Sequence, residues 1–142
     1  MLLDFSFLDA AAFPSCLLPA AFNKLLRLAE AEVARAQGRL PDEVREAANE
    51  CSVTYETIAD AIKDDDELAD DLLGLFEGLN RLDPEPTGPE DMPRIRLFLD
   101  NLWDYADADE LLYRKEIRIT YLHELGHYLG WDEGKIDEMG LG

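Results

Sequence analysis

Two histidines one helical turn apart constrain this chain more than any other feature of its sequence. His123 and His127 are the only histidines among 142 residues. On an α-helix, side chains four positions apart lie on the same face, one turn above each other. Two imidazoles at this spacing can bind one metal ion without any change in the backbone. The pattern therefore predicts a helix over this segment, with a metal-binding face.

A carboxylate lies between the two histidines. Glu124 follows His123 directly, and the helical period places it about 100° around the axis. The spacing resembles that of the zincins, in which a carboxylate with this offset lies beside the open position of the metal, where it can accept a proton from zinc-bound water. Zn²⁺ accepts imidazole ligands and keeps a coordination position open when a protein supplies only three ligands. The segment therefore predicts a Zn²⁺ site with Glu124 as the catalytic base.

The residues after His127 offer two candidates for a third ligand. Gly130 lies three positions on, where a left-handed residue ends a helix and turns the chain back. Asp132 and Glu133 follow it. Glu133, three residues past the glycine, is the preferred ligand. Asp132 is the alternative, because a turn of unknown geometry can present either carboxylate.

Periodicity predicts the other elements of the chain. Helical spacing of apolar residues indicates helices over residues 19–37, from Pro41 onward and from Asp107 to about residue 129. Alternation of side chains indicates strands over residues 52–58 and 94–100. Residues 72–79 contain two glycines and fit either a short strand or a turn, whereas the proline-rich residues 82–93 fit a loop.

The metal helix has two different faces. Glu116, Thr120, His123 and His127 share one face, and an apolar stripe lies roughly opposite. The stripe consists of Leu111, Leu122, Leu125 and Leu129. Such a helix is anchored on one side and open on the other. Gly126, inside it, costs about 1 kcal/mol relative to alanine, and a close approach to the sheet would explain it.

The charge of the chain limits its partners. Thirty-two acidic residues against 13 basic ones give a net charge of −19. Such a surface repels nucleic acid and anionic membranes, so neither is expected as a partner. The charge fits a solvated acidic surface that serves solubility, and a basic partner or substrate is the alternative. No stretch approaches the length of a membrane span.

The cysteines and the N-terminal segment indicate a compartment. Cys16 and Cys51 are isolated from each other and from the histidines, which is typical of a reduced intracellular protein. The apolar N-terminus lacks a basic region and is interrupted by Asp4 and Asp9, which argues against a signal peptide. We therefore expect a cytoplasmic protein, and a monomer.

The segment from His123 to Glu133 resembles the minimal zincins, a bacterial family of small zincin-like metallopeptidase domains. The resemblance extends more weakly over residues 41–142, where the strands, the glycine-containing segment and the proline loop occur in the expected order. It implies an α+β fold in which a small mixed β-sheet packs on helices, with the metal-binding helix in the C-terminal half. It also implies His123 and His127 as zinc ligands and Glu124 as the base. Metzincin-type sites use His or Asp at the position that Glu133 holds here.

The resemblance also implies how a substrate binds. In zincins an edge strand next to the metal helix binds an extended substrate by backbone pairing. Residues 94–100 are the candidate strand, and the alternative is that they form an interior strand without substrate contact. A tyrosine hydroxyl could stabilise the oxyanion, and three tyrosines lie near the motif in sequence: Tyr113, Tyr121 and Tyr128.

We therefore expect residues 1–18 to form an N-terminal arm and residues 19–142 a single zincin-like domain. The expected function is zinc-dependent hydrolysis of a peptide bond in a peptide or protein substrate, by an activated water with Glu124 as general base. Two alternatives remain open: a metal-stabilised binding module without catalysis, and an acidic protein-interaction domain.

Overall fold

The computed structural model describes residues 19–139, so the arm predicted over residues 1–18 lies outside the described residues. The helices are α1 (Pro19–Gly38), α2 (Asp42–Asn49), α3 (Ile58–Asp64), α4 (Leu99–Tyr105), α5 (Glu110–Tyr128) and α6 (Glu133–Glu138), with a short 3₁₀ helix, η2 (Pro89–Asp91). The strands are β1 (Ser52–Glu56), β2 (Gly74–Glu77) and β3 (Arg94–Phe98). Within this described part, no helix is long and apolar enough to cross a membrane.

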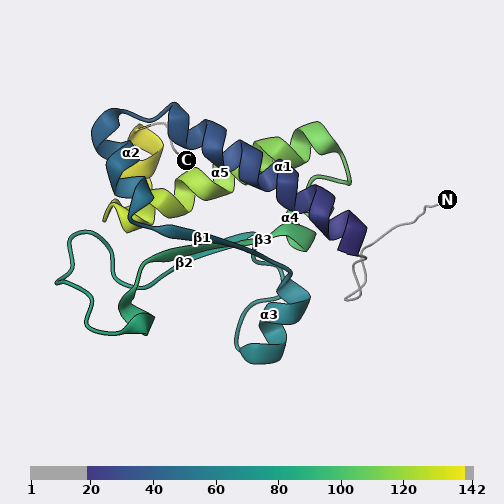
Figure 1. The fold of residues 1–142 in the computed structure, drawn as a ribbon, viewed down its shortest axis with the longest axis horizontal. Helices are drawn as coiled ribbons and strands as arrows, with labels where there is room; N and C mark the ends of the chain where they lie inside the picture. The colour runs from purple at the N-terminus through teal and green to yellow at the C-terminus, as the bar shows by residue number, and fades with distance from the viewer. Residues whose placement is uncertain (1–18, 140–142) are drawn as a thin grey trace.

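The strands of residues 19–139 form one mixed sheet in the order β1-β3-β2. The central strand β3 runs parallel to β1 and antiparallel to β2. Helices α1, α2 and α5 lie over one face of the sheet, and α3 lies on the other (Figure 1). The fold is therefore α+β, a small mixed sheet packed on helices with the histidine-bearing helix in the C-terminal half, which confirms the expected fold class.

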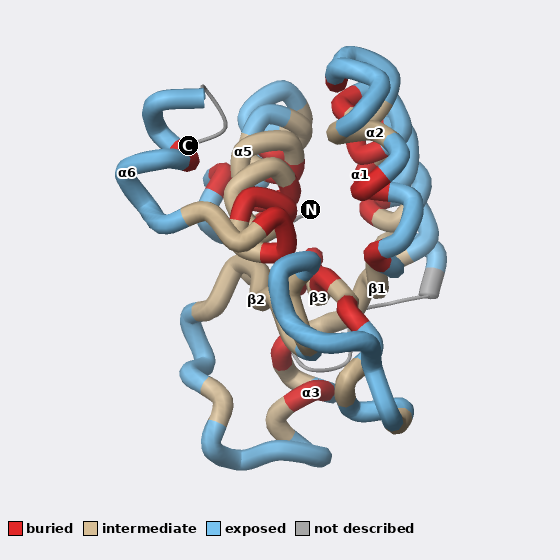
Figure 2. The backbone as a smooth tube through the Cα atoms, turned by 90° about the vertical axis from the view of Figure 1, so that its left-hand side faces the viewer, coloured by how far each residue is buried: buried red, intermediate tan, exposed pale blue. Residues whose placement is uncertain are grey.

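The core lies between α1, α5 and the sheet. The buried positions of α1 recur every three or four residues, and these are Leu25, Ala29, Val33 and Ala36. They belong to one core cluster with buried residues of α5 and the sheet, and in Figure 2 the buried segments gather on the inner sides of the helices. This pattern confirms the helix predicted over residues 19–37. A smaller cluster of Ile58, Ala61 and Phe98 fixes α3 beneath the sheet.

The strand predicted over residues 94–100 is real but is not an edge strand. It ends at Phe98, and β3 lies between β1 and β2. The strand that forms the sheet edge beside α5 is β2, in the stretch that fitted either a strand or a turn. Of the two possibilities left open for residues 94–100, the interior strand is therefore correct and the free edge is wrong. The sequence could not decide between them, because strand order depends on pairing between distant segments rather than on local alternation.

Two helix boundaries also differ from the sequence prediction. The apolar alternation runs to Asp100, but the strand ends at Phe98 and residues 99–105 form α4. The carboxylate of Asp100 then accepts the backbone N–H of Ile58 at 2.8 Å and tethers the start of α3. The predicted cap of α5 at Asp107 is wrong as well. Asp107 has a φ of 54°, and Asp109 caps the helix by accepting the N–H of Leu112 at 3.1 Å.

Charged side chains tie the three strands together. Arg96 on β3 donates two hydrogen bonds to the Glu56 carboxylate on β1, at 2.8 and 2.9 Å, and one to Glu77 on β2 at 3.2 Å. Arg94 bonds the other oxygen of Glu77 at 2.6 Å. The hydrogen bonds from Arg96 lower the pKa of the Glu56 carboxyl below its usual value. Fork-shaped pairing of this kind is among the stronger ionic contacts in proteins.

The pairing of Glu56 predicts a specific pH dependence of stability. Since the folded-state pKa of Glu56 lies below the unfolded value of about 4.3, its contribution is present above that pH and is lost as the pH falls through the folded pKa. We expect Glu56→Gln to lower the free energy of unfolding by about 1 kcal/mol at pH 7, measured by urea unfolding. The deficit should shrink towards zero below about pH 4.

The exposed Glu46 on α2 provides the control, because Glu46→Gln removes the same charge. It should change stability little at either pH. A deficit in Glu56→Gln that stays constant down to pH 3 would contradict the role of the ion pair.

Candidate metal centre

Helix α5 is held by a buried side that combines most of the predicted leucine stripe with two tyrosines and an isoleucine. Leu125 and Leu129 are buried and Leu122 packs against the core, whereas Leu111 is exposed. The helix is therefore anchored against α1 and the sheet, as expected, and Tyr113, Ile117 and Tyr121 complete its buried side. Its other side carries the candidate ligands.

The hydroxyls of the three tyrosines hold the helix in place. The Tyr113 hydroxyl donates to the carbonyl oxygen of Leu25 at 2.9 Å. Tyr121 accepts a hydrogen bond from the Gln37 side chain at 2.9 Å. The Tyr128 hydroxyl donates to the carboxylate of Glu50 at 3.0 Å.

All three partners of these hydroxyls belong to α1 or follow α2 directly. The tyrosines thus serve packing on the buried side of α5. This arrangement does not support the predicted oxyanion role for any of them.

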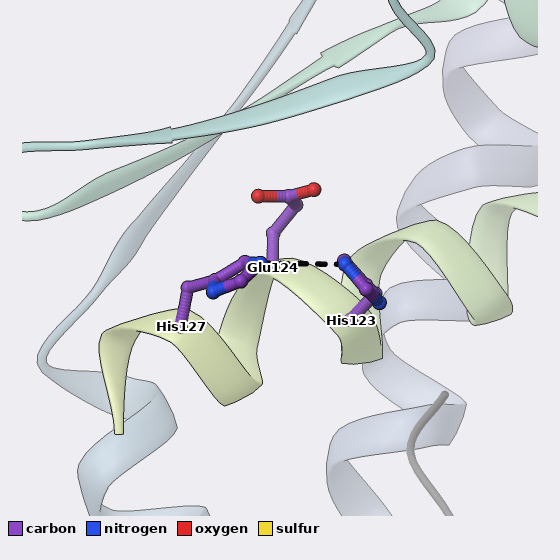
Figure 3. Close-up of side chains that lie close together, drawn as sticks. All are labelled: His123, Glu124 and His127. Carbon is purple, nitrogen blue, oxygen red and sulfur yellow. Dashed lines mark hydrogen bonds between the residues drawn. The ribbon is translucent and has the colours of Figure 1, made fainter. Parts of the chain in front are cut away.

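Three potential ligand atoms meet at one point on the open side of α5. The Nε2 atoms of His123 and His127 are 3.3 Å apart and face each other (Figure 3). The Glu133 Oε2 lies 3.3 Å from His123 Nε2 and 3.0 Å from His127 Nε2. Ligands about 2.05 Å from a tetrahedral Zn²⁺ ion lie about 3.3 Å from one another. This donor set of two imidazoles and one carboxylate therefore fits zinc in both chemistry and spacing.

The structure separates the two candidates for the third ligand. The Asp132 carboxylate caps α6, since it accepts the backbone N–H of Lys135 at 2.8 Å. Glu133 is the first residue of α6, and its carboxylate points to the two histidines. Both candidates are carboxylates, but it is the Glu133 carboxylate that lies next to both imidazoles. The geometry therefore favours the glutamate that the sequence analysis preferred.

A helix-ending turn directs α6 back towards the histidines. Gly130 has a φ of 82°, the left-handed conformation expected for it. The N–H of Trp131 bonds the carbonyl of Gly126 at 3.0 Å, and the N–H of Gly130 bonds that of His127 at 3.0 Å. These two hydrogen bonds define a Schellman motif. The motif reverses the chain within three residues and brings Glu133 beside the metal face.

Close contact between α5 and α6 fixes the position of the third candidate ligand. A Cβ atom on Gly126 would lie 2.5 Å from Cγ1 of Ile136, a residue of α6 with no exposed surface. The glycine inside α5 is therefore explained by close packing of α6, and the expected approach to the sheet at this position is wrong. The close approach to the sheet occurs one and a half turns earlier, where Gly74 of β2 leaves room for the methyl group of Thr120.

Glu124 lies beside the three-ligand cluster and faces the sheet. Its carboxylate is directed towards the strands (Figure 3), and one of its oxygens still lies within 4.8 Å of a ring nitrogen of each histidine. The carboxylate accepts a hydrogen bond from the backbone N–H of Phe76 on β2. Burial raises the pKa of the Glu124 carboxyl above its usual value, and His127 and His123 partly oppose this shift. Burial thus favours a carboxyl that can both accept and return a proton, as a general base must.

Open cavities flank Glu124 on both sides. A cavity of about 580 Å³ includes His127 in its wall, and one of about 320 Å³ includes His123. Glu124 borders both, and so does strand β2. The cluster therefore lies in a cleft along the edge of the sheet, which the sequence analysis missed because it placed the edge strand elsewhere.

The sequence matches the model of a known family. The match, to the family described as zincin-like metallopeptidase, covers residues 48–142. This region contains the whole sheet, α5 and the candidate ligands, and it spans more than half of the chain. The protein therefore belongs to the zincin-like metallopeptidase family, as the motif predicted. No curated protein matches the chain. Helix α1 and most of α2 precede the matched region.

The two adjacent acids provide a matched test of the third ligand. Glu133→Gln replaces the carboxylate of the candidate third ligand by an amide of the same size, whereas Asp132→Asn keeps a good helix cap. We expect Glu133→Gln to weaken zinc binding at least about tenfold and Asp132→Asn to weaken it much less. Competition with a chromophoric chelator measures both. The reverse order of effects would identify Asp132 as the ligand.

The contact between α5 and α6 provides a second test. Gly126→Ala introduces a methyl group that must displace Ile136, and with it Glu133. We expect zinc affinity to fall about tenfold, although alanine favours the helix itself. Adding Ile136→Ala should recover part of the affinity, because the smaller side chain leaves room for the methyl group. Additive losses in the double variant would show that the contact does not position Glu133.

Proposed function

We propose that this protein is a zinc-dependent peptidase that hydrolyses a peptide bond in an extended substrate. The observation that carries the proposal is the convergence of the two histidine nitrogens and the Glu133 oxygen within 3.0–3.3 Å, with a separate carboxylate beside them. Membership of a metallopeptidase family supports it. Zinc bound there would polarise the substrate carbonyl and lower the pKa of a water molecule towards ~7.

The residues of this chain have distinct roles in the proposal. His123, His127 and Glu133 hold the metal and leave a coordination position open. Glu124 accepts the proton of the attacking water and delivers a proton to the leaving amine. The backbone N–H of Phe76 orients the Glu124 carboxylate, because it donates a hydrogen bond to it. A base fixed in this way needs little rearrangement during the reaction.

Strand β2 is the proposed binding edge for the substrate backbone. The carbonyl of Leu73 accepts the N–H of Phe98, so Leu73 faces the neighbouring strand β3. Peptide groups alternate in direction along a strand. Gly74 and Phe76 therefore direct their backbone groups to the outer edge of the sheet. There the N–H of Phe76 bonds Glu124, and the remaining groups of these two residues are the ones proposed to pair with a substrate. An extended peptide can add to such an edge by main-chain pairing.

We propose action on peptide or protein substrates, as a monomer, in the cytoplasm. The unpaired, buried thiol of Cys51 supports a reducing compartment.

Replacing the proposed base separates metal binding from catalysis. We expect Glu124→Gln to retain one zinc per chain and to lower kcat/KM for peptide hydrolysis by about 10²–10⁴-fold, because an amide cannot accept the proton. Zinc content is measured by atomic absorption, and hydrolysis with an internally quenched peptide library. Glu46→Gln, on the distant helix α2, should match the wild type in both measurements.

The outcomes distinguish this proposal from its rivals. Hydrolysis that persists in Glu124→Gln would contradict the proposed mechanism. Stoichiometric zinc without cleavage of any peptide would favour a metal-stabilised binding module. Absence of zinc from both the wild type and His127→Ala would leave an acidic interaction domain as the better explanation.

A further inference from the structure

The cavity on the His123 side has a distinct chemical character. It measures about 320 Å³, comparable to small ligand pockets, and is open to solvent. Leu73 and Ile119 are the aliphatic residues of its wall, and Glu116 is the one acidic residue there other than Glu124. The lining away from the metal face comprises Leu73, Gly74, Tyr105, Glu116, Ile119 and Thr120.

Glu116 is the acidic group of this cavity. It lies seven residues before His123, two turns away on the same face of α5. Its side chain is half-buried, and no ion pair or hydrogen bond joins its carboxylate to any residue in 19–139. By contrast, Glu110 on the same helix pairs with Lys24 and Arg114. A partly buried carboxylate without a cation retains the full capacity to bind one.

The cavity on the other side of Glu124 differs in this respect. Its wall includes the apolar side chains of Leu75, Phe76 and Trp131. The acid in that wall, Asp132, already accepts the N–H of Lys135 as the cap of α6. Both sides of the cleft therefore carry an acidic side chain away from the metal face. Within residues 19–139, however, only the one next to His123 takes part in no hydrogen bond or ion pair.

We propose that Glu116 selects a substrate with a lysine or arginine side chain next to the scissile bond, an inference that rests on the proposed peptidase function. The methylene groups of the basic side chain pack against the aliphatic wall, and its charged end pairs with the Glu116 carboxylate. Long basic side chains commonly bury their stems while the charged group finds a polar partner. The net charge of −19 attracts basic peptides in general, and Glu116 adds selection at one position.

The direction of β2 determines which side of the scissile bond carries the basic residue. The cavity with Glu116 borders Leu73 and Gly74 at the start of β2, and the other cavity borders Leu75 and Phe76 further along. Antiparallel pairing is the more stable arrangement per residue. A substrate antiparallel to β2 places its later residues at the start of that strand. The basic residue therefore follows the scissile bond.

Peptides that differ at one position test the proposal. One series carries lysine or norleucine directly after the scissile bond, so that only the charged end differs. We expect zinc-loaded wild type to cleave the lysine peptide with a kcat/KM at least about tenfold higher, because charge-assisted hydrogen bonds exceed neutral ones. In Glu116→Gln the ratio of the two values should fall towards one. Glu46→Gln removes the same charge at a distance and should keep the ratio of the wild type.

A binding measurement supplies a readout independent of turnover. The probes are two zinc-chelating hydroxamates whose peptide part extends on the carboxyl side and carries a lysine or a norleucine side chain. Titration calorimetry should show the same preference in Kd, lost in Glu116→Gln and retained in Glu46→Gln. If binding or cleavage showed no preference for lysine, or if the preference survived in Glu116→Gln, the role of Glu116 would be overturned while the proposed peptidase function would stand. Failure to bind zinc, either hydroxamate and all peptides would overturn the peptidase function, and this proposal with it.

Discussion

The contact between Gly126 and Ile136 is the constraint on which the candidate metal site depends. The two histidines need only a helix, but Glu133 reaches them only because α6 packs directly on the backbone of α5. A glycine in a helix costs about 1 kcal/mol, and burial of an isoleucine side chain contributes about 1.5–3 kcal/mol. Burial of Ile136 therefore outweighs the cost of a glycine at position 126, and the same contact positions Glu133 as a candidate ligand.

The sequence was most informative where chemistry and local geometry coincide. His123, Glu124 and His127 could be placed relative to one another because their arrangement follows from the helical period alone. The left-handed Gly130 was predictable for a similar reason, since its conformation is a local property. The distinction between Asp132 and Glu133 was not, because it required knowledge of which side chain caps the next helix.

Features that depend on distant segments could not be predicted in the same way. Alternation identified β3 as a strand but gave no information on its central place, which is set by pairing with β1 and β2. The tyrosines of α5 looked available for chemistry, but the carbonyl of Leu25 and the side chains of Gln37 and Glu50 come from segments roughly 80 residues away. Glu116 lay on the correct helix face in the sequence, yet the cavity around it emerges only when β2 is in place.

The division of the candidate ligands between two helices has a consequence for how a metal would enter and leave. Two of them stand on a long helix with a fully buried side, whereas the third begins a short helix near the end of the chain. Segments with few buried contacts open more readily than the core. Metal exchange would then proceed by detachment of α6 while the two histidines stay in place. The residence time of the ion would therefore depend on how tightly Ile136 of α6 packs against Gly126 of α5.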